Sequence, residues 1–202
     1  MGFFKNLFGK KEVSELPKKA EQKEAEQIEA EQIEEELYGI DKDYAHERAI
    51  ELIPEEFFWS GIDDLAPFGS DDGDMALSEF RDWKKSNPKT ETYECLKWTI
   101  EGVSEKNIAD YNEEILDRTL IKSQIEDDDF NDQHYIFTVD ISVIATGFGQ
   151  LVDEGKIDKK NKPIIQLAIN RQKLWAELAT DWEHRIEYIG NLSVLDRVLK
   201  IA

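Results

Sequence analysis

The sequence predicts a mainly α-helical protein, with a single compact helical domain that is preceded by an N-terminal helical arm. Apolar residues recur three and four positions apart over most of the chain, and Pro or Gly stands where these segments end. The chain has 202 residues, of which 40% are apolar, so it is long enough to bury a sizeable core.

The first segment, residues 1–17, is basic and amphipathic. Apolar side chains on one helical face with lysines on the other are typical of a helix that lies on an anionic membrane surface. We expect a peripheral membrane contact here, and a frayed terminus that docks on the rest of the protein is the alternative. The expected contact residues are Phe3, Phe4, Leu7, Phe8, Lys10 and Lys11.

The second segment, residues 18–39, is rich in Glu, Gln and Ala and ends at Gly39. From Glu21 to Leu37 there are eight Glu and one Lys, so repulsion between like charges favours an extended arm. Ile28 and Ile33 are five residues apart and therefore lie on different faces, which excludes a coiled-coil seam. The sequence predicts a solvated helical spacer.

The remaining residues, 40–202, form the predicted globular domain. Its first helices are expected to follow Asp43 until Pro54, to span Met75–Ser86 after a run of acids, and to span Thr92–Glu101. A further helical segment is expected to begin at Ser104, since Ile108, Tyr111 and Ile115 repeat at helical spacing.

Residues 135–144 are rich in β-branched side chains, so a short strand or hairpin at Tyr135–Val139 is left open. The spacing of the apolar residues up to Gly155 favours a helix. Gly147 and Gly149 are interpreted as small residues that let neighbouring helices approach closely. Two more helices are expected, at Ile164–Ala179 and from Ser193 onward.

The charge balance limits the possible partners. The formal net charge is −20 and the pI is about 4.5, which disfavours general binding to nucleic acids. The single cysteine, Cys95, cannot form an intramolecular disulfide, and no secretory segment or long apolar run is evident. We expect a cytoplasmic protein, held on the inner face of the membrane if the first segment binds lipid.

No template of catalysis or metal binding is complete. The three histidines, at 46, 134 and 184, fit no zinc motif, and Gly147-Phe-Gly149 lacks the third glycine of a dinucleotide loop. Asp127, Asp129 and Asn131 start like a calcium loop, but the glycine and the final glutamate of that loop are missing. The sequence therefore predicts no catalytic residue, metal or cofactor, and Cys95 is expected to be a buried, inert thiol.

Between Glu55 and Glu79 the chain carries eight acids and no Lys or Arg, with aromatic residues between the acids. Carboxylates steer and pair with a basic protein while aromatic side chains anchor it, so this segment is a candidate partner-binding surface. The structural alternative is that the aromatics fill the core and the acids cap helices. The candidate contact residues are Phe57, Phe58, Trp59, Asp63, Asp64, Phe68, Asp71, Asp72 and Asp74.

Three stretches, His46–Trp59, Ala66–Ala76 and Ala145–Asp158, resemble the YfeS-like bacterial proteins. The resemblance implies a bacterial source and a soluble domain, and it brings no established activity, cofactor or site residue. The arm before Asp41 lies outside it.

The sequence thus predicts an intracellular bacterial protein-binding domain with no catalytic activity, a specific form of which is an immunity-type inhibitor of a basic nuclease. The alternative is an enzyme or a small-ligand-binding protein. Its site would be built from scattered carboxylates such as Asp71, Asp74 and Glu79, with His46 or His134 nearby.

Overall fold

A computed structural model describes residues 39–104, 107–127 and 131–202, and of the side chains at 131–135 nothing is stated. These residues belong to one compact unit, Leu37–Ala202. They form α-helices and short 3₁₀ turns and contain no strand, which confirms the mainly helical prediction. The α-helices are α2 (Glu47–Leu52), α3 (Asp71–Ser86), α4 (Thr92–Ser104), α5 (Arg118–Ile125), α6 (Asn131–Glu154), α7 (Lys162–Leu178) and α8 (Arg185–Ile201).

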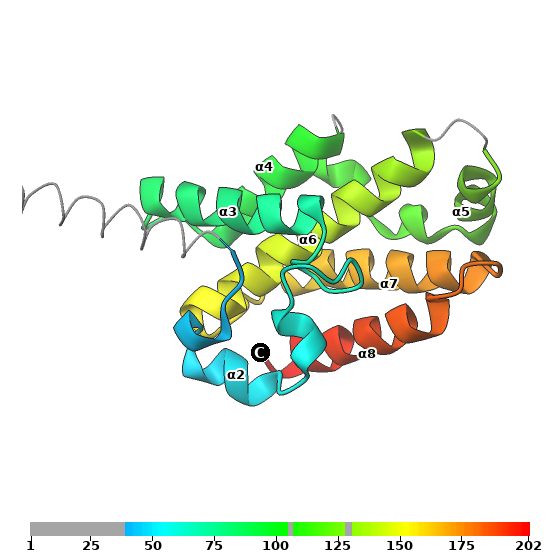
Figure 1. Cartoon of the computed structure of the whole chain (residues 1–202). Coiled ribbons are helices and arrows are strands. Elements are labelled where there is room, and N and C mark those ends of the chain that lie inside the picture. The colour runs from blue at the N-terminus through cyan, green and yellow to red at the C-terminus, as the bar shows by residue number, and fades with distance from the viewer. Residues whose placement is uncertain (1–38, 105–106, 128–130) are drawn as a thin grey trace, which may run out of the picture. The chain divides into compact units, whose positions relative to one another are not determined.

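Helix α6 is the central element of the fold. It packs against α3 and α4 on one side and against α7 on the other, and α8 covers α7 (Figure 1). Every residue from Val139 to Val152 is buried, so this stretch has no solvent-facing side. The segment that was ambiguous between strand and helix is therefore helical, because α6 is surrounded by other helices and needs no polar face.

Two glycines allow the neighbouring helices to approach α6. A β-carbon at Gly149 would lie 3.0 Å from Leu77 Cδ1 and 3.2 Å from Phe80 Cδ1, both on α3. A β-carbon at Gly147 would meet Ile165 on α7. The prediction that these glycines serve close helix packing is confirmed.

A buried polar cluster joins α6 to α7. The Asp140 carboxylate, with no exposed surface, accepts hydrogen bonds from Arg171 Nε at 2.7 Å and from Gln172 Nε2 at 2.9 Å. Tyr111 Oη also donates to Asp140, and Tyr188 Oη donates to Gln172 Oε1 at 3.0 Å. Because the ion pair is bidentate and surrounded by further donors, its charges are compensated inside the core.

Helix α6 ends at the predicted glycine. Gly155 has a φ of 68°, a left-handed conformation that other residues rarely adopt, and this turns the chain into the loop 155–161. His46 lies against this turn, and its backbone N–H donates to Val152 O at 2.7 Å. The start of α2 is thereby fixed to the end of α6.

Two predicted helices differ from the structure. The segment after Ser104 contains 3₁₀ turns, η3 (Ile108–Asp110) and η4 (Glu113–Leu116), before α5 begins. The side chains of Asn107 and Asn112 cap these turns by accepting from backbone N–H groups two residues further on, which replaces a continuous helix by local turns. The last helix begins at Arg185, more than two turns before the expected start at Ser193.

The first predicted helix is also shorter than expected, because η1 (Lys42–Tyr44) precedes α2 as a separate 3₁₀ turn.

By length and composition alone, Ile136–Glu154 of α6 is long and apolar enough to cross a membrane. Of that apolar window, 83% is buried inside the protein, a property it shares with the core helices of globular proteins.

Candidate functional site

The aromatic residues of the Glu55–Glu79 segment belong mostly to the core. Phe58 and Phe68 have no exposed surface, and their ring centroids are 5.3 Å apart in an edge-to-face arrangement. Phe58 also packs against Phe148 of α6. A partner protein cannot touch fully covered rings, so the assignment of Phe58 and Phe68 as contact residues is corrected. Phe57 and Trp59 are half-buried, and Trp59 Nε1 donates to Ile53 O at 2.9 Å.

Two of the predicted acids have structural roles. Asp63 Oδ1 accepts a hydrogen bond from the Leu65 backbone N–H at 3.0 Å, which fixes a turn. Asp72 Oδ2 accepts from Thr138 Oγ1 of α6 at 3.0 Å. Both carboxylates are therefore committed to contacts within the protein.

The other predicted acids, Asp64, Asp71 and Asp74, are exposed. Asp71 and Asp74 lie in the first turn of α3, and Asp64 lies in the preceding loop 60–70. This loop folds back on itself, because a β-carbon at Gly69 would be 2.0 Å from Asp63 O. Ile62, 94% exposed, projects from the same loop. We call Ile62, Asp64, Asp71 and Asp74 the acidic surface.

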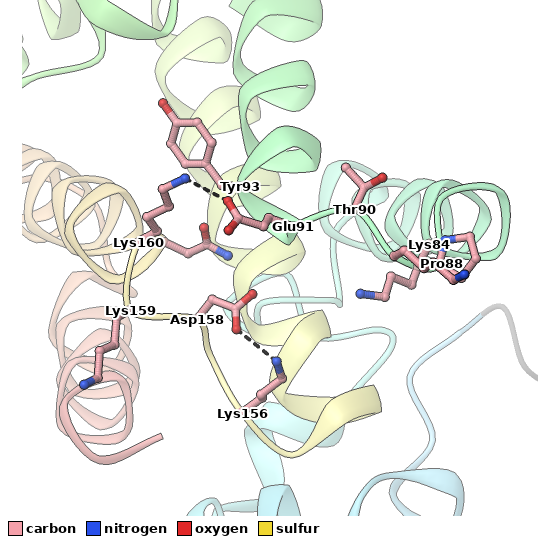
Figure 2. Close-up of a pocket in the computed structure, with 11 residues that line it drawn as sticks. Lys84, Pro88, Thr90, Glu91, Tyr93, Lys156, Asp158, Lys159 and Lys160 are labelled. Atoms are coloured by element: carbon pink, nitrogen blue, oxygen red, sulfur yellow. Dashed lines mark hydrogen bonds and ion pairs between the residues drawn. The ribbon is translucent and has the colours of Figure 1, made fainter.

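A second candidate site is a pocket of about 490 Å³ between the α3–α4 connection and the loop 155–161 (Figure 2). Pro88 follows the end of α3, and Glu91 directly precedes α4, so one wall is the turn between these helices. The other wall is the loop that follows the Gly155 turn. We call this site the lysine pocket; its lining residues include Lys84, Lys89, Lys156, Lys159 and Lys160 together with Glu91 and Asp158.

Ion pairs bridge the lysine pocket. Lys160 Nζ lies 2.7 Å from Glu91 Oε2 and 4.9 Å from the centre of the Tyr93 ring, and so links the two walls. Lys156 Nζ lies 3.0 Å from Asp158 Oδ1, as Figure 2 shows. These hydrogen bonds to carboxylates raise the pKa values of Lys156 and Lys160, so both side chains are cationic at neutral pH.

The Glu154 carboxylate at the end of α6 pairs with Lys84 Nζ at 2.7 Å. Burial alone raises the pKa of Glu154, but the hydrogen bonds from Lys84 and Gln150 outweigh this effect, and the pKa lies below its ordinary value.

Figure 2 shows Lys159 extending away from the other labelled lysines. Neither Lys89 nor Lys159 has an ion-pair partner among the described residues.

A buried polar side chain of the core, Gln150, holds the loop 155–161 in place. Gln150 on α6 has no exposed surface, and its Nε2 donates to Glu154 Oε2 at 3.0 Å and to Asp158 Oδ2 at 2.9 Å. Gln150 Oε1 accepts from the Asp158 backbone N–H at 3.1 Å. One buried amide thus holds both the end of the helix and the loop in place.

Asn161 lines the pocket directly before α7 and has no exposed surface. Its Nδ2 donates to Gln150 Oε1 at 3.4 Å, whereas its Oδ1 has no hydrogen-bond partner within the described residues. A buried acceptor without a donor is rare and costs free energy.

Sequence reasoning missed the lysine pocket. Lys84 and Lys160 are 76 positions apart in the sequence, and only the packing of α3 and α6 brings their segments together. A signal was nevertheless present, since Lys156, Lys159 and Lys160 form a basic cluster in a strongly acidic chain.

The histidines and the cysteine have no catalytic arrangement in the described part of the chain. His46 Nδ1 caps α2 by accepting from the Arg48 backbone N–H at 3.1 Å, and His184 is exposed beside Glu183. Cys95 is 1% exposed, which confirms that its side chain is buried. Burial raises the pKa of its thiol to about 12, which favours the unreactive thiol form. Among the side chains of residues 39–104, 107–127 and 136–202, no three from His, Cys, Asp or Glu are grouped as metal ligands.

Several predicted residues fall outside the described residues. They are the membrane-contact set, Phe3, Phe4, Leu7, Phe8, Lys10 and Lys11, and Asp129 of the calcium-like stretch. Nothing about the side chain of His134 is described either.

No protein family, curated protein or solved structure matches this chain. The resemblance to the YfeS-like proteins therefore stays a prediction from the stretches His46–Trp59, Ala66–Ala76 and Ala145–Asp158.

Proposed function

We propose that this protein is a binding module without catalytic activity whose acidic surface docks a basic protein. The observation that carries this proposal is Ile62, a large apolar side chain that is 94% exposed between Ser60 and the paired acids Asp63 and Asp64. Exposed apolar side chains surrounded by charge are common where proteins bind each other.

The loop that presents Ile62 is well ordered by hydrogen bonds. Ser60 Oγ accepts from the backbone N–H groups of Ile62 and Asp63, at 3.4 Å and 3.1 Å. The Ala66 N–H donates to Asp63 O at 2.7 Å. A loop that is already fixed loses little conformational entropy when a partner binds, which favours affinity.

The negative charge of the acidic surface also favours a basic partner. Asp64, Asp71 and Asp74 are exposed, and the net charge of the whole chain is −20, so a basic protein is attracted from a distance and meets carboxylates at the contact. An immunity-type inhibitor that covers the basic active site of a nuclease is the specific form of this proposal.

A charge-reversal experiment tests the proposal. The variant Asp64→Lys, Asp71→Lys, Asp74→Lys changes only exposed carboxylates and spares Asp63 and Asp72, whose side chains are needed within the fold. Affinity capture from a bacterial lysate should enrich a basic protein on the wild type and lose it on this variant.

The matched control reverses three exposed acids elsewhere, Glu113→Lys, Glu114→Lys and Glu187→Lys, which also lie in first turns of helices. The control should capture the same protein as the wild type. With the captured protein purified, Ile62→Ser should weaken its binding, and higher salt should slow its association. Equal capture by the test variant, or an acidic captured protein, would contradict the proposal.

We further propose that the first segment places the protein on anionic membrane. The support is the sequence pattern of residues 1–17, where Phe3, Phe4, Leu7 and Phe8 cluster at helical spacing in a segment rich in lysine. The full chain should float with vesicles that contain anionic lipid, and a form that begins at Tyr38 should not. Equal flotation of both forms would exclude this role.

The alternative of an enzyme built on scattered carboxylates finds less support. Asp71, Asp74 and Glu79 are exposed on α3, and they do not line the lysine pocket, whose charge is of the opposite sign. A small-ligand function is better argued from that pocket.

A further inference from the structure

The lysine pocket carries a positive formal charge, whereas the net charge of the whole chain is negative. Five lysines line it against two carboxylates, which leaves three formal positive charges, and two remain when Glu154, the partner of Lys84, is included. The chain as a whole carries −20. A local excess of lysine in a hollow of an acidic protein favours an anionic ligand that the rest of the surface would repel.

The ion pairs in the pocket do not block such a ligand. Glu91 is 67% exposed and Lys160 is 62% exposed, and pairs this accessible contribute little to stability. Lys89 has no carboxylate partner among the described residues. An incoming dianion can therefore recruit these ammonium groups without breaking a strong interaction. Lysine ammonium groups are common ligands of phosphate.

Size narrows the class of ligand further. A volume of about 490 Å³ is within the range of small-molecule sites and is larger than a single inorganic anion needs. The lining is mostly polar, so an apolar ligand is excluded. We propose that the lysine pocket binds a phosphate monoester with a polar body, such as a sugar phosphate, whose phosphate pairs with the exposed lysines of the lining, among them Lys89 and Lys160.

Titration calorimetry of the full chain with glucose 6-phosphate tests this, with inorganic phosphate and glucose as the comparison probes. Glucose 6-phosphate should bind with a dissociation constant of about 1 mM or lower and more tightly than phosphate, and glucose should not bind. Lys89→Gln with Lys160→Gln should weaken binding at least about tenfold, because two charged donors are lost.

The control variant, Lys122→Gln with Lys200→Gln, removes two exposed lysines that do not line the pocket and should bind like the wild type.

Three results would overturn the inference: no binding of glucose 6-phosphate at about 10 mM, equal weakening in the test and control variants, or phosphate binding as tightly as glucose 6-phosphate. None of these results depends on the capture experiment at the acidic surface, so the two proposals fail or succeed separately.

Discussion

Gly147 on α6 faces Ile165 on α7 so closely that a β-carbon at position 147 would lie 2.2 Å from Ile165 Cδ1 and 2.6 Å from its Cγ1. Ile165 has no exposed surface, so its side chain has no free space into which it can move. The absence of a side chain at this one position sets the distance between the two helices that carry the buried ion pair.

Gly147→Ala should therefore lower the free energy of unfolding by about 1–3 kcal/mol, since overpacking outweighs the better helix propensity of alanine. Gly190 on α8 provides the matched control, because a β-carbon there meets nothing within 4 Å. Gly190→Ala should raise the free energy of unfolding by about 0.5–1 kcal/mol. Urea denaturation measures both, and a shift of the same sign in the two variants would contradict this packing argument.

The second prediction concerns the buried pair Asp140–Arg171. Arg171→Leu leaves the Asp140 carboxylate uncompensated in the core, so it should cost about 3–5 kcal/mol of stability. The double variant Asp140→Leu, Arg171→Leu should be more stable than the single one. Arg118→Leu, which breaks the exposed pair with Glu177, should cost less than about 1 kcal/mol. A similar loss in the two single variants would show that the buried pair has no special role.

The third prediction concerns Cys95. Burial raises the pKa of its thiol to about 12, so at about pH 8 only roughly one molecule in ten thousand carries the reactive thiolate. The native protein should react with a colorimetric disulfide reagent far more slowly than the protein in denaturant. Rapid reaction of the native protein would mean that α4 opens locally and exposes the side chain.

The fourth prediction is a dependence of stability on pH. Burial alone raises the pKa of Asp196, but hydrogen bonds from Lys200 at 2.9 Å and Gln166 at 2.8 Å outweigh it and hold the pKa below its ordinary value. A carboxyl whose pKa is lower in the folded protein contributes stability above its unfolded pKa of about 4, and the contribution is lost as the pH falls through the folded pKa.

Asp196→Asn should therefore be less stable than the wild type at about pH 7, and the difference should shrink at about pH 3. Chemical denaturation at both pH values measures it. A difference that is as large in acid as at neutral pH would show that the carboxylate charge of Asp196 contributes nothing.

The sequence predicted those helices whose ends carry strong local signals. Pro88 marks the end of α3, and Gly155 ends α6, because neither residue type continues a helix readily. The segment 104–116 was predicted wrongly, although its apolar residues have helical spacing. Asn107 and Asn112 compete there with the backbone for N–H groups, and this competition decides in favour of short turns.

The start of α8 was missed for a different reason. Gly190 and Asn191 have low helix propensity, yet both lie inside α8, where the packing of Tyr188 and Leu192 against the core overrides that propensity. For the candidate sites, sequence patterns located the exposed acids but could not tell which of the nearby aromatic side chains are buried. Phe58 and Phe68 are core residues because α6 passes beneath them, a contact between residues distant in the sequence.

Gln150 gives the loop 155–161 a property that matters for any molecule that enters the lysine pocket. Its amide binds Glu154, the Asp158 side chain and the Asp158 backbone at once, and it does so from a core helix that is buried from Val139 to Val152. The loop is thus organised in advance of any encounter, so almost none of its motion has to be frozen at the moment of association, and the recognition surface behaves as a rigid template.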